Sequence, residues 1–189
     1  MLSAFIRFGL KHIIWRWSRV YRWACEDCYR DYPVQAPESI EALARTIEGC
    51  EWTADGIRQI WDAWSYPGLV QWRIDHQVKE IGDCDEFAGY VVAAIHEALA
   101  AGHDLRWGGQ QVLGAHVLTT VWRRGWGGHA VALLELAGGE LTCMDYGLPW
   151  GRFKTPADAA LQVARNYSAQ AEVLAWALYD SELRPVKAG

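Results

Sequence analysis

Residues 82–102 read GDCDEFAGYVVAAIHEALAAG, and this stretch decides the fold class. Apolar side chains recur in it at three- and four-residue steps, which predicts a helix of about five turns that ends at Gly102. Asp83 is the expected N-cap, and Glu86 completes a capping-box pattern three residues later. Cys84 therefore falls at the first helical position, where backbone N–H groups and the helix dipole favour a thiolate.

The hydrophobic period changes downstream of this helix. Alternating apolar residues predict three strands joined by Gly-rich turns, and antiparallel pairing is the economical arrangement for such short connections. After Pro156 the period returns to that of a helix, which we expect to continue as far as Leu178 and to cover the core. The strands are expected at residues 112–124, 129–136 and 140–146, with turns at 125–128 and 138–139.

Shorter helices are predicted upstream. Pro37 opens one that Gly49 closes, and Thr53 is the expected N-cap of a second, which Tyr66-Pro67-Gly68 breaks. Residues 69–79 are helical or irregular. The predicted fold class is therefore α+β, with an antiparallel sheet packed on the helix that opens with Cys84 and with additional N- and C-terminal helices.

Residues 2–24 predict a basic amphipathic helix, because apolar residues follow helical spacing and Lys and Arg lie on another face. This helix could contact an anionic membrane surface, dock on a partner, or pack on its own domain. Pro33 and Pro37 indicate a linker. The predicted organisation is an arm and linker over residues 1–32, followed by one domain over residues 33–189.

Composition restricts the class of protein. The chain has 189 residues, of which 51% are hydrophobic, enough to bury the core of one globular domain. Its net charge is −5, and because residues 1–24 carry five basic and no acidic side chains, the remainder carries −10. This charge argues against nucleic-acid binding. No apolar run reaches membrane-spanning length and no secretory signal is recognised, so we expect a cytoplasmic location.

Five cysteines do not form a disulfide framework in a chain of this size, and a reducing compartment is favoured. Cys25 and Cys28 have the spacing of a zinc-binding pair, but no second pair follows. Zinc is therefore a weak alternative.

The residues whose side chains could take part in a reaction lie on the predicted helix and strands. The acidic neighbours of Cys84 oppose thiolate formation, so an imidazolium partner or a cation is needed. His129 opens a strand directly after two glycines, and Asp145 lies sixteen residues later on the next strand. There it could hold one ring nitrogen of His129 while the other nitrogen faces Cys84. Together these three residues predict an acyl-transfer triad.

Three sequence blocks occur in order along the chain. They are Trp64-Ser65-Tyr66-Pro67, then Gly82-Asp83-Cys84-Asp85-Glu86-Phe87-Ala88, then Gly128-His129-Ala130-Val131 followed by Met144-Asp145. In order and spacing these blocks resemble the bacterial transglutaminase-like cysteine proteinases, within the transglutaminase and papain-like superfamily. The likeness spans residues 55–150, roughly half of the chain.

The resemblance implies a papain/transglutaminase-like core and a role for each matched residue. Cys84 would be the nucleophile, His129 the base and Asp145 the orienting residue. Gln77, seven residues before Cys84, resembles the oxyanion-stabilising glutamine of papain-like enzymes, and Gln71 is the competing choice.

The implied activity is that of a cysteine peptidase, which cleaves a peptide or protein substrate through a thioester. Two alternatives stay open: transglutaminase-type crosslinking or deamidation, and a non-catalytic binding module on the same fold. No cofactor is required. The resemblance nevertheless implies that acidic residues beside the nucleophile can bind Ca²⁺, and Asp83, Asp85 and Glu86 match those positions. The competing interpretation is that Asp83 and Glu86 only cap the helix.

Overall fold

The helix predicted after Gly82 forms as α4, Cys84–Ala100, in the computed structural model, which describes residues 29–52, 66–125, 127–182 and 184–189. Its capping box is also formed. Glu86 Oε2 accepts the Asp83 N–H at 2.9 Å, and Asp83 Oδ1 accepts the Asp85 N–H at 3.2 Å. The apolar stripe of the helix is buried in the largest core cluster, as its periodicity predicts.

The predicted antiparallel sheet is confirmed, and it is larger than expected. Seven strands lie in the order β7-β6-β5-β4-β8-β9, with β3 beside β4, and every pairing is antiparallel. The three predicted strands are β4, β5 and β6. A separate parallel pair is formed by β1, Glu51–Trp52, and β2, Glu80–Gly82. The strands of the large sheet are β3 Arg106–Trp107, β4 Gln110–Arg123, β5 Gly127–Leu136, β6 Leu141–Met144, β7 Trp150–Phe153, β8 Glu172–Tyr179 and β9 Pro185–Ala188.

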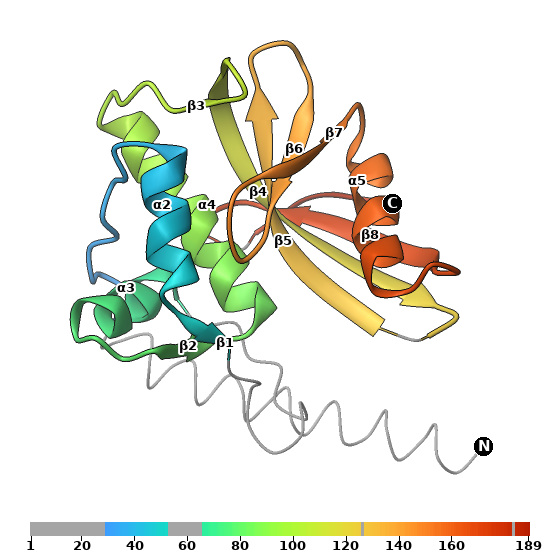
Figure 1. Ribbon diagram of the computed structural model, residues 1–189, viewed down its shortest axis with the longest axis horizontal. Coiled ribbons are helices and arrows are strands. Elements are labelled where there is room, and N and C mark those ends of the chain that lie inside the picture. Colours follow the sequence, from blue (N-terminus) through green and yellow to red (C-terminus); the bar gives the residue numbers. More distant parts are fainter. Residues whose placement is uncertain (1–28, 53–65, 126, 183) are drawn as a thin grey trace.

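Helices cover both faces of this sheet, so the fold is α+β (Figure 1). On one face α4 packs against β4 and β5, with α2, Ile40–Glu48, and α3, Pro67–Asp75, beside it. On the other face α5, Pro156–Tyr167, covers a smaller cluster with Leu118, Val131 and Leu133. Ser39 rather than Pro37 caps α2, because its hydroxyl accepts the N–H of Ala42.

The predicted C-terminal helix is too long. It ends at Tyr167, and the following Ser168 has an extended backbone, with φ −149° and ψ 113°. Residues 172–179, which we expected to be helical, form β8 and pair with the edge of β4. This eight-residue run is apolar on both faces, so its periodicity fits a buried strand as well as a helix. The edge of β4 decides between them, because its backbone groups need partners.

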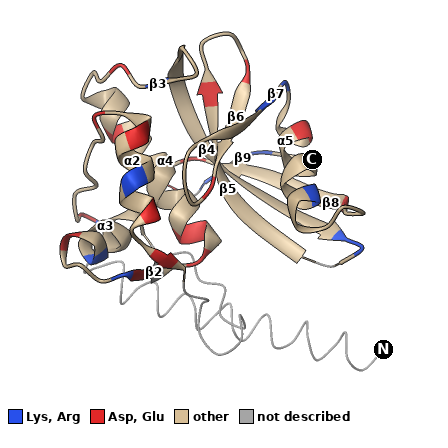
Figure 2. Ribbon diagram, viewed as in Figure 1, with Lys and Arg blue, Asp and Glu red and all other residues tan. Residues whose placement is uncertain are grey.

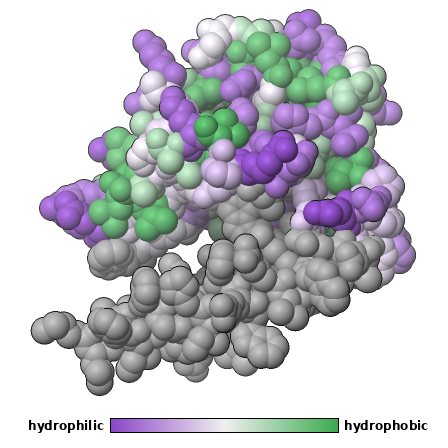
Figure 3. Space-filling model, turned by 180° about the vertical axis from the view of Figure 1, so that it is seen from behind, coloured by the Kyte–Doolittle hydropathy of each residue, from purple (hydrophilic) through white to green (hydrophobic). Residues whose placement is uncertain are grey.

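Several predictions lie outside the described residues: the arm over residues 2–24 with its membrane or partner contact, the Cys25 and Cys28 pair, and the helix from Thr53. Within the described part of the chain, no helix is long and apolar enough to cross a membrane. Hydrophobic and hydrophilic side chains are mixed on the rear face of the molecule (Figure 3).

Candidate active site

Cys84 is the first residue of α4, and β2 leads directly into it. The thiol residue is half-buried and packs against the core beneath α4. Gly82 makes this entry possible. Its φ is +134°, and a Cβ there would lie 2.7 Å from the Glu86 carboxylate that caps the helix. The local sequence therefore fixes Cys84 as the first residue of the helix.

His129 and Asp145 are brought together as the sequence predicts. The Nε2 atom of His129 lies 2.9 Å from Asp145 Oδ2. The imidazole is 7% exposed and the carboxylate 20%, so the pair is largely shielded from solvent. His129 is the third residue of β5, and Asp145 directly follows β6. Because a carboxylate only accepts hydrogen bonds, this contact favours the tautomer that carries its proton on Nε2.

The end of β6 explains how the two faces of the sheet meet at this site. β6 pairs with β5 only from Ala132 to Glu135, so β6 does not reach His129. Asp145 and Tyr146 leave the sheet at this point. Tyr146 packs against the core on the α4 face, whereas Asp145 contacts His129, which also meets Tyr167 at the end of α5.

Tyr146 connects the start of α4 with the imidazole. Its ring centroid lies 4.6 Å from that of Phe87, one turn into α4, and 6.1 Å from that of His129. Burial raises the pKa of Tyr146 above its ordinary value, and the nearby charges of Cys84 and Asp145 raise it further. Cys84, His129 and Asp145, the three candidate residues, thus all lie near this one tyrosine.

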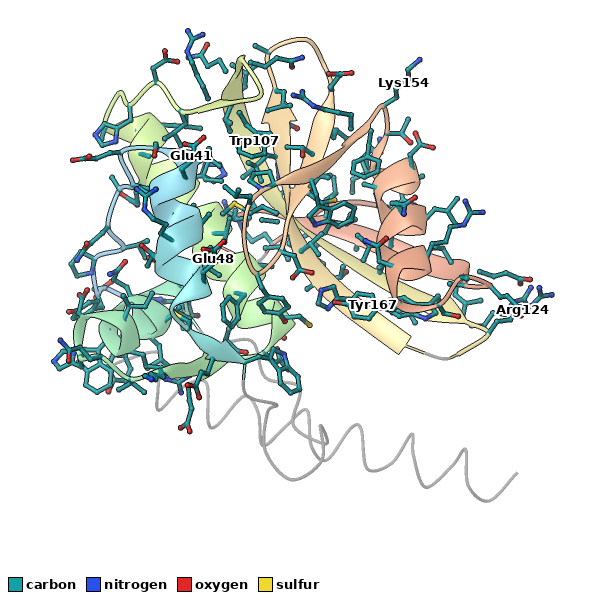
Figure 4. All side chains as sticks on the ribbon, viewed as in Figure 1. Glu41, Glu48, Trp107, Arg124, Lys154 and Tyr167 are labelled. Atoms are coloured by element: carbon teal, nitrogen blue, oxygen red, sulfur yellow. The ribbon has the colours of Figure 1, made fainter. Side chains whose placement is uncertain are left out.

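Tyr167 is a site residue that the sequence interpretation missed. The sequence pattern placed it only in the apolar stripe of the helix expected after Pro156. In the structure it is the last residue of α5 and lies beside β5 (Figure 4). Its hydroxyl lies 2.8 Å from His129 Nε2, the same nitrogen that contacts Asp145. Burial, followed by the charges of Asp145 and Cys84, raises the pKa of Tyr167 to about 12. No spacing rule reports such a contact between a helix end and a distant strand.

The two glutamine candidates have different surroundings. Gln77 is exposed in the turn after α3, with φ +57°. Gln71 is buried, and its amide is fully engaged: Oε1 accepts from Tyr90 and from the backbone of Gln35, and Nε2 donates to Asp75. Gln71 therefore ties α3 to α4. Among the described contacts, neither glutamine touches the triad.

The acidic residues at the start of α4 were the candidates for calcium, and Figure 2 shows red segments around β2 and this first turn. Single ligand atoms of Asp83, Cys84 and Asp85 lie within 4.8 Å of one another. Glu86 is not in this group, because its carboxylate accepts the Asp83 N–H. Calcium needs six to eight oxygen ligands. Two carboxylates and one thiol do not fit it, whereas the capping box accounts for Asp83 and Glu86.

Comparison of the chain with protein-family models, with curated proteins and with solved structures finds no match. The transglutaminase-like motif blocks therefore stay a resemblance. The function has to be argued from the chemistry of the site itself.

Proposed function

We propose that the protein is a thiol-dependent amide hydrolase or acyltransferase, in the first place a cysteine peptidase of the transglutaminase-like family. One observation carries the proposal: His129 contacts Asp145 through Nε2, which leaves Nδ1 for a thiol at the start of α4. The proposed core is papain/transglutaminase-like, with the helix that opens at Cys84 packed on the antiparallel sheet.

The chemistry follows from the proton positions. With its proton on Nε2, His129 accepts the thiol proton at Nδ1, and the Cys84 sulfur attacks the amide carbonyl carbon. The imidazolium then protonates the leaving amine, which leaves a thioester on Cys84. His129 deprotonates the attacking water, and hydrolysis releases the acid and regenerates the thiol. The backbone N–H of Cys84 is the proposed oxyanion donor, and Gln77 stays a prediction for a second donor.

Water competes with amines for the thioester, and solvent access favours water. Asp145 is 20% exposed and the Tyr167 residue 56% exposed, so solvent reaches the rim of the site. Hydrolysis of a peptide or protein amide is therefore the leading activity. Transglutaminase-type crosslinking or deamidation is the alternative outcome of the same thioester, and a non-catalytic binding module would form none.

Thiol labelling tests the proposal directly. Limited iodoacetamide treatment followed by peptide mapping should label Cys84 before the other four thiols. Burial raises the pKa of both Cys50 and Cys143, which makes these two poor nucleophiles near neutral pH. Earlier labelling of Cys25, Cys28 or Cys50 would contradict the assignment.

An activity screen completes the test. Hydrolysis of peptide amides should be lost in Cys84→Ala and kept in the matched control Cys50→Ala, which removes a half-buried thiol from the end of α2. Equal activity of wild type and Cys84→Ala would overturn the proposal. Product analysis with and without a primary amine separates hydrolysis from transamidation.

A further inference from the structure

The hydroxyl of Tyr167 is the second oxygen on Nε2 of His129, the ring nitrogen that faces Asp145. It lies 2.8 Å from Nε2, and Asp145 Oδ2 lies 2.9 Å from the same atom. The two rings also meet, with centroids 4.6 Å apart at an interplanar angle of 52°. Tyr167 therefore touches the imidazole both through its oxygen and through its ring.

A buried tryptophan packs against the ring of Tyr167. The Trp122 ring stacks on Tyr167 with centroids 5.7 Å apart at 27°, and Trp122 is 3% exposed. Trp122 itself packs on the backbone at Gly127, two residues before His129. The rigid strand pair of β4 and β5 thus holds the tyrosine that contacts the imidazole.

The position of the imidazole proton determines whether the Tyr167 hydroxyl donates or accepts the hydrogen bond to Nε2. Neutral imidazole carries one proton, and Asp145 can only accept it, so the proton sits on Nε2. The Tyr167 oxygen then accepts a share of the same N–H, and its own proton points elsewhere. Since the phenol is neutral at physiological pH, it adds an acceptor to Nε2–H without adding charge.

We propose that Tyr167 is a positioning residue that, together with Asp145, holds the proton of His129 on Nε2 and the ring in place, so that Nδ1 is free to take the thiol proton. This inference rests on the proposed function, in which His129 is the base. An acceptor on Nε2–H stabilises the charged imidazolium more than the neutral ring. Tyr167 therefore favours the thiolate–imidazolium pair over the neutral pair.

Tyr167→Phe tests the role of the oxygen, because it keeps the ring that stacks on Trp122. The matched control is Tyr32→Phe, which also removes a tyrosine hydroxyl from one side-chain hydrogen bond, in this case one donated to Asp75. In Tyr167→Phe we expect kcat to fall about fivefold, as for the loss of one hydrogen bond, with KM nearly unchanged. The alkaline limb of the kcat/KM profile should move to lower pH. Tyr32→Phe should change neither.

A second measurement does not depend on turnover. Side-chain ¹⁵N NMR reports which nitrogen of neutral His129 carries the proton, and the Nε2–H fraction should be smaller in Tyr167→Phe than in wild type. An unchanged fraction together with an unchanged pH profile would overturn the role of Tyr167. Full activity of Cys84→Ala would instead overturn the proposed function, so the two failures are distinguishable.

Discussion

Replacing Asp145 with Asn removes one charge from the site and changes almost no volume. Oδ2 of Asp145 now accepts from His129 Nε2 at 2.9 Å. If the Asn amide nitrogen occupies that position, it donates, so Nε2 must become the acceptor and the ring proton moves to Nδ1. The base then presents an N–H to the thiol and cannot accept its proton.

The size of the effect follows from the shielding of the pair. A hydrogen bond to a charged group contributes about 1.5–3 kcal/mol, and the 7% and 20% exposures of the two side chains place this one among the partly buried cases. That free energy corresponds to a loss in kcat of roughly tenfold to more than one hundredfold, and the inverted tautomer adds to it.

Steady-state kinetics on the peptide amide found by the activity screen measure this loss, and thermal unfolding provides the control. Asp145→Asn should stay folded at the assay temperature, because in a chain of this length each kcal/mol lost lowers the melting temperature by only about 2–4 °C. A kcat within twofold of wild type would remove Asp145 from the triad. A large loss of kcat that merely tracks unfolding would refute the electrostatic explanation.

Three further tests concern the glycines before His129, the carboxylate that follows β8 and the first turn of α4. Gly127→Ala should lower the free energy of unfolding by about 1–3 kcal/mol, because the new Cβ would lie 2.6 Å from the buried Trp122 ring. The melting temperature and the activity should fall together. The same change at Gly128, where the nearest atom is 3.4 Å away, should cost far less. Burial tends to raise the pKa of Asp180, but hydrogen bonds from Arg184 and from the Glu182 backbone together hold that pKa below its ordinary value. Asp180→Asn should therefore melt below wild type at pH 7, and in acid, as wild-type Asp180 itself becomes protonated, this difference should disappear. Thermal melts with calcium and with a chelator should coincide, because Asp83 and Glu86 serve the capping box and Asp85 alone adds too few oxygen ligands for calcium. A calcium-dependent rise in the melting temperature would contradict this.

Elements defined by adjacent residues were predictable from the sequence. The start of α4 is such a case, because Asp83 and Glu86 satisfy each other within four residues. The β4–β5–β6 meander is another, since its turns are short and glycine-rich. The strand at residues 172–179 was not predictable in this way. Its apolar residues suit a helix equally well, and pairing with β4, about fifty to sixty residues earlier, and with β9 fixes it as a strand.

The same distinction applies to the site. The pairing of His129 with Asp145 could be anticipated, because His129 lies on β5 and Asp145 directly follows β6, the next strand of the same meander. Tyr167 could not, because its contact depends on where α5 ends and on how α5 crosses the sheet. The choice between the two glutamines as oxyanion donor also could not be made from the sequence, because it depends on tertiary contacts. Gln71 is committed to tying α3 to α4, and Gln77 is in an exposed turn.

The first turn of α4 surrounds the proposed nucleophile with negative charge, and the fold offsets that charge in two places. The carboxylates of Asp83 and Glu86 are directed at backbone N–H groups at the positive end of the helix dipole. A thiolate at Cys84 uses the same dipole, so the carboxylates and the sulfur compete for it. The remaining positive charge is the proposed imidazolium of His129, which α4 does not hold. Its position depends on Asp145 after β6 and on Tyr167 at the end of α5. Activation of a thiol on one side of the sheet is therefore expected to fail when residues on the other side are changed, although no atom of α4 is altered.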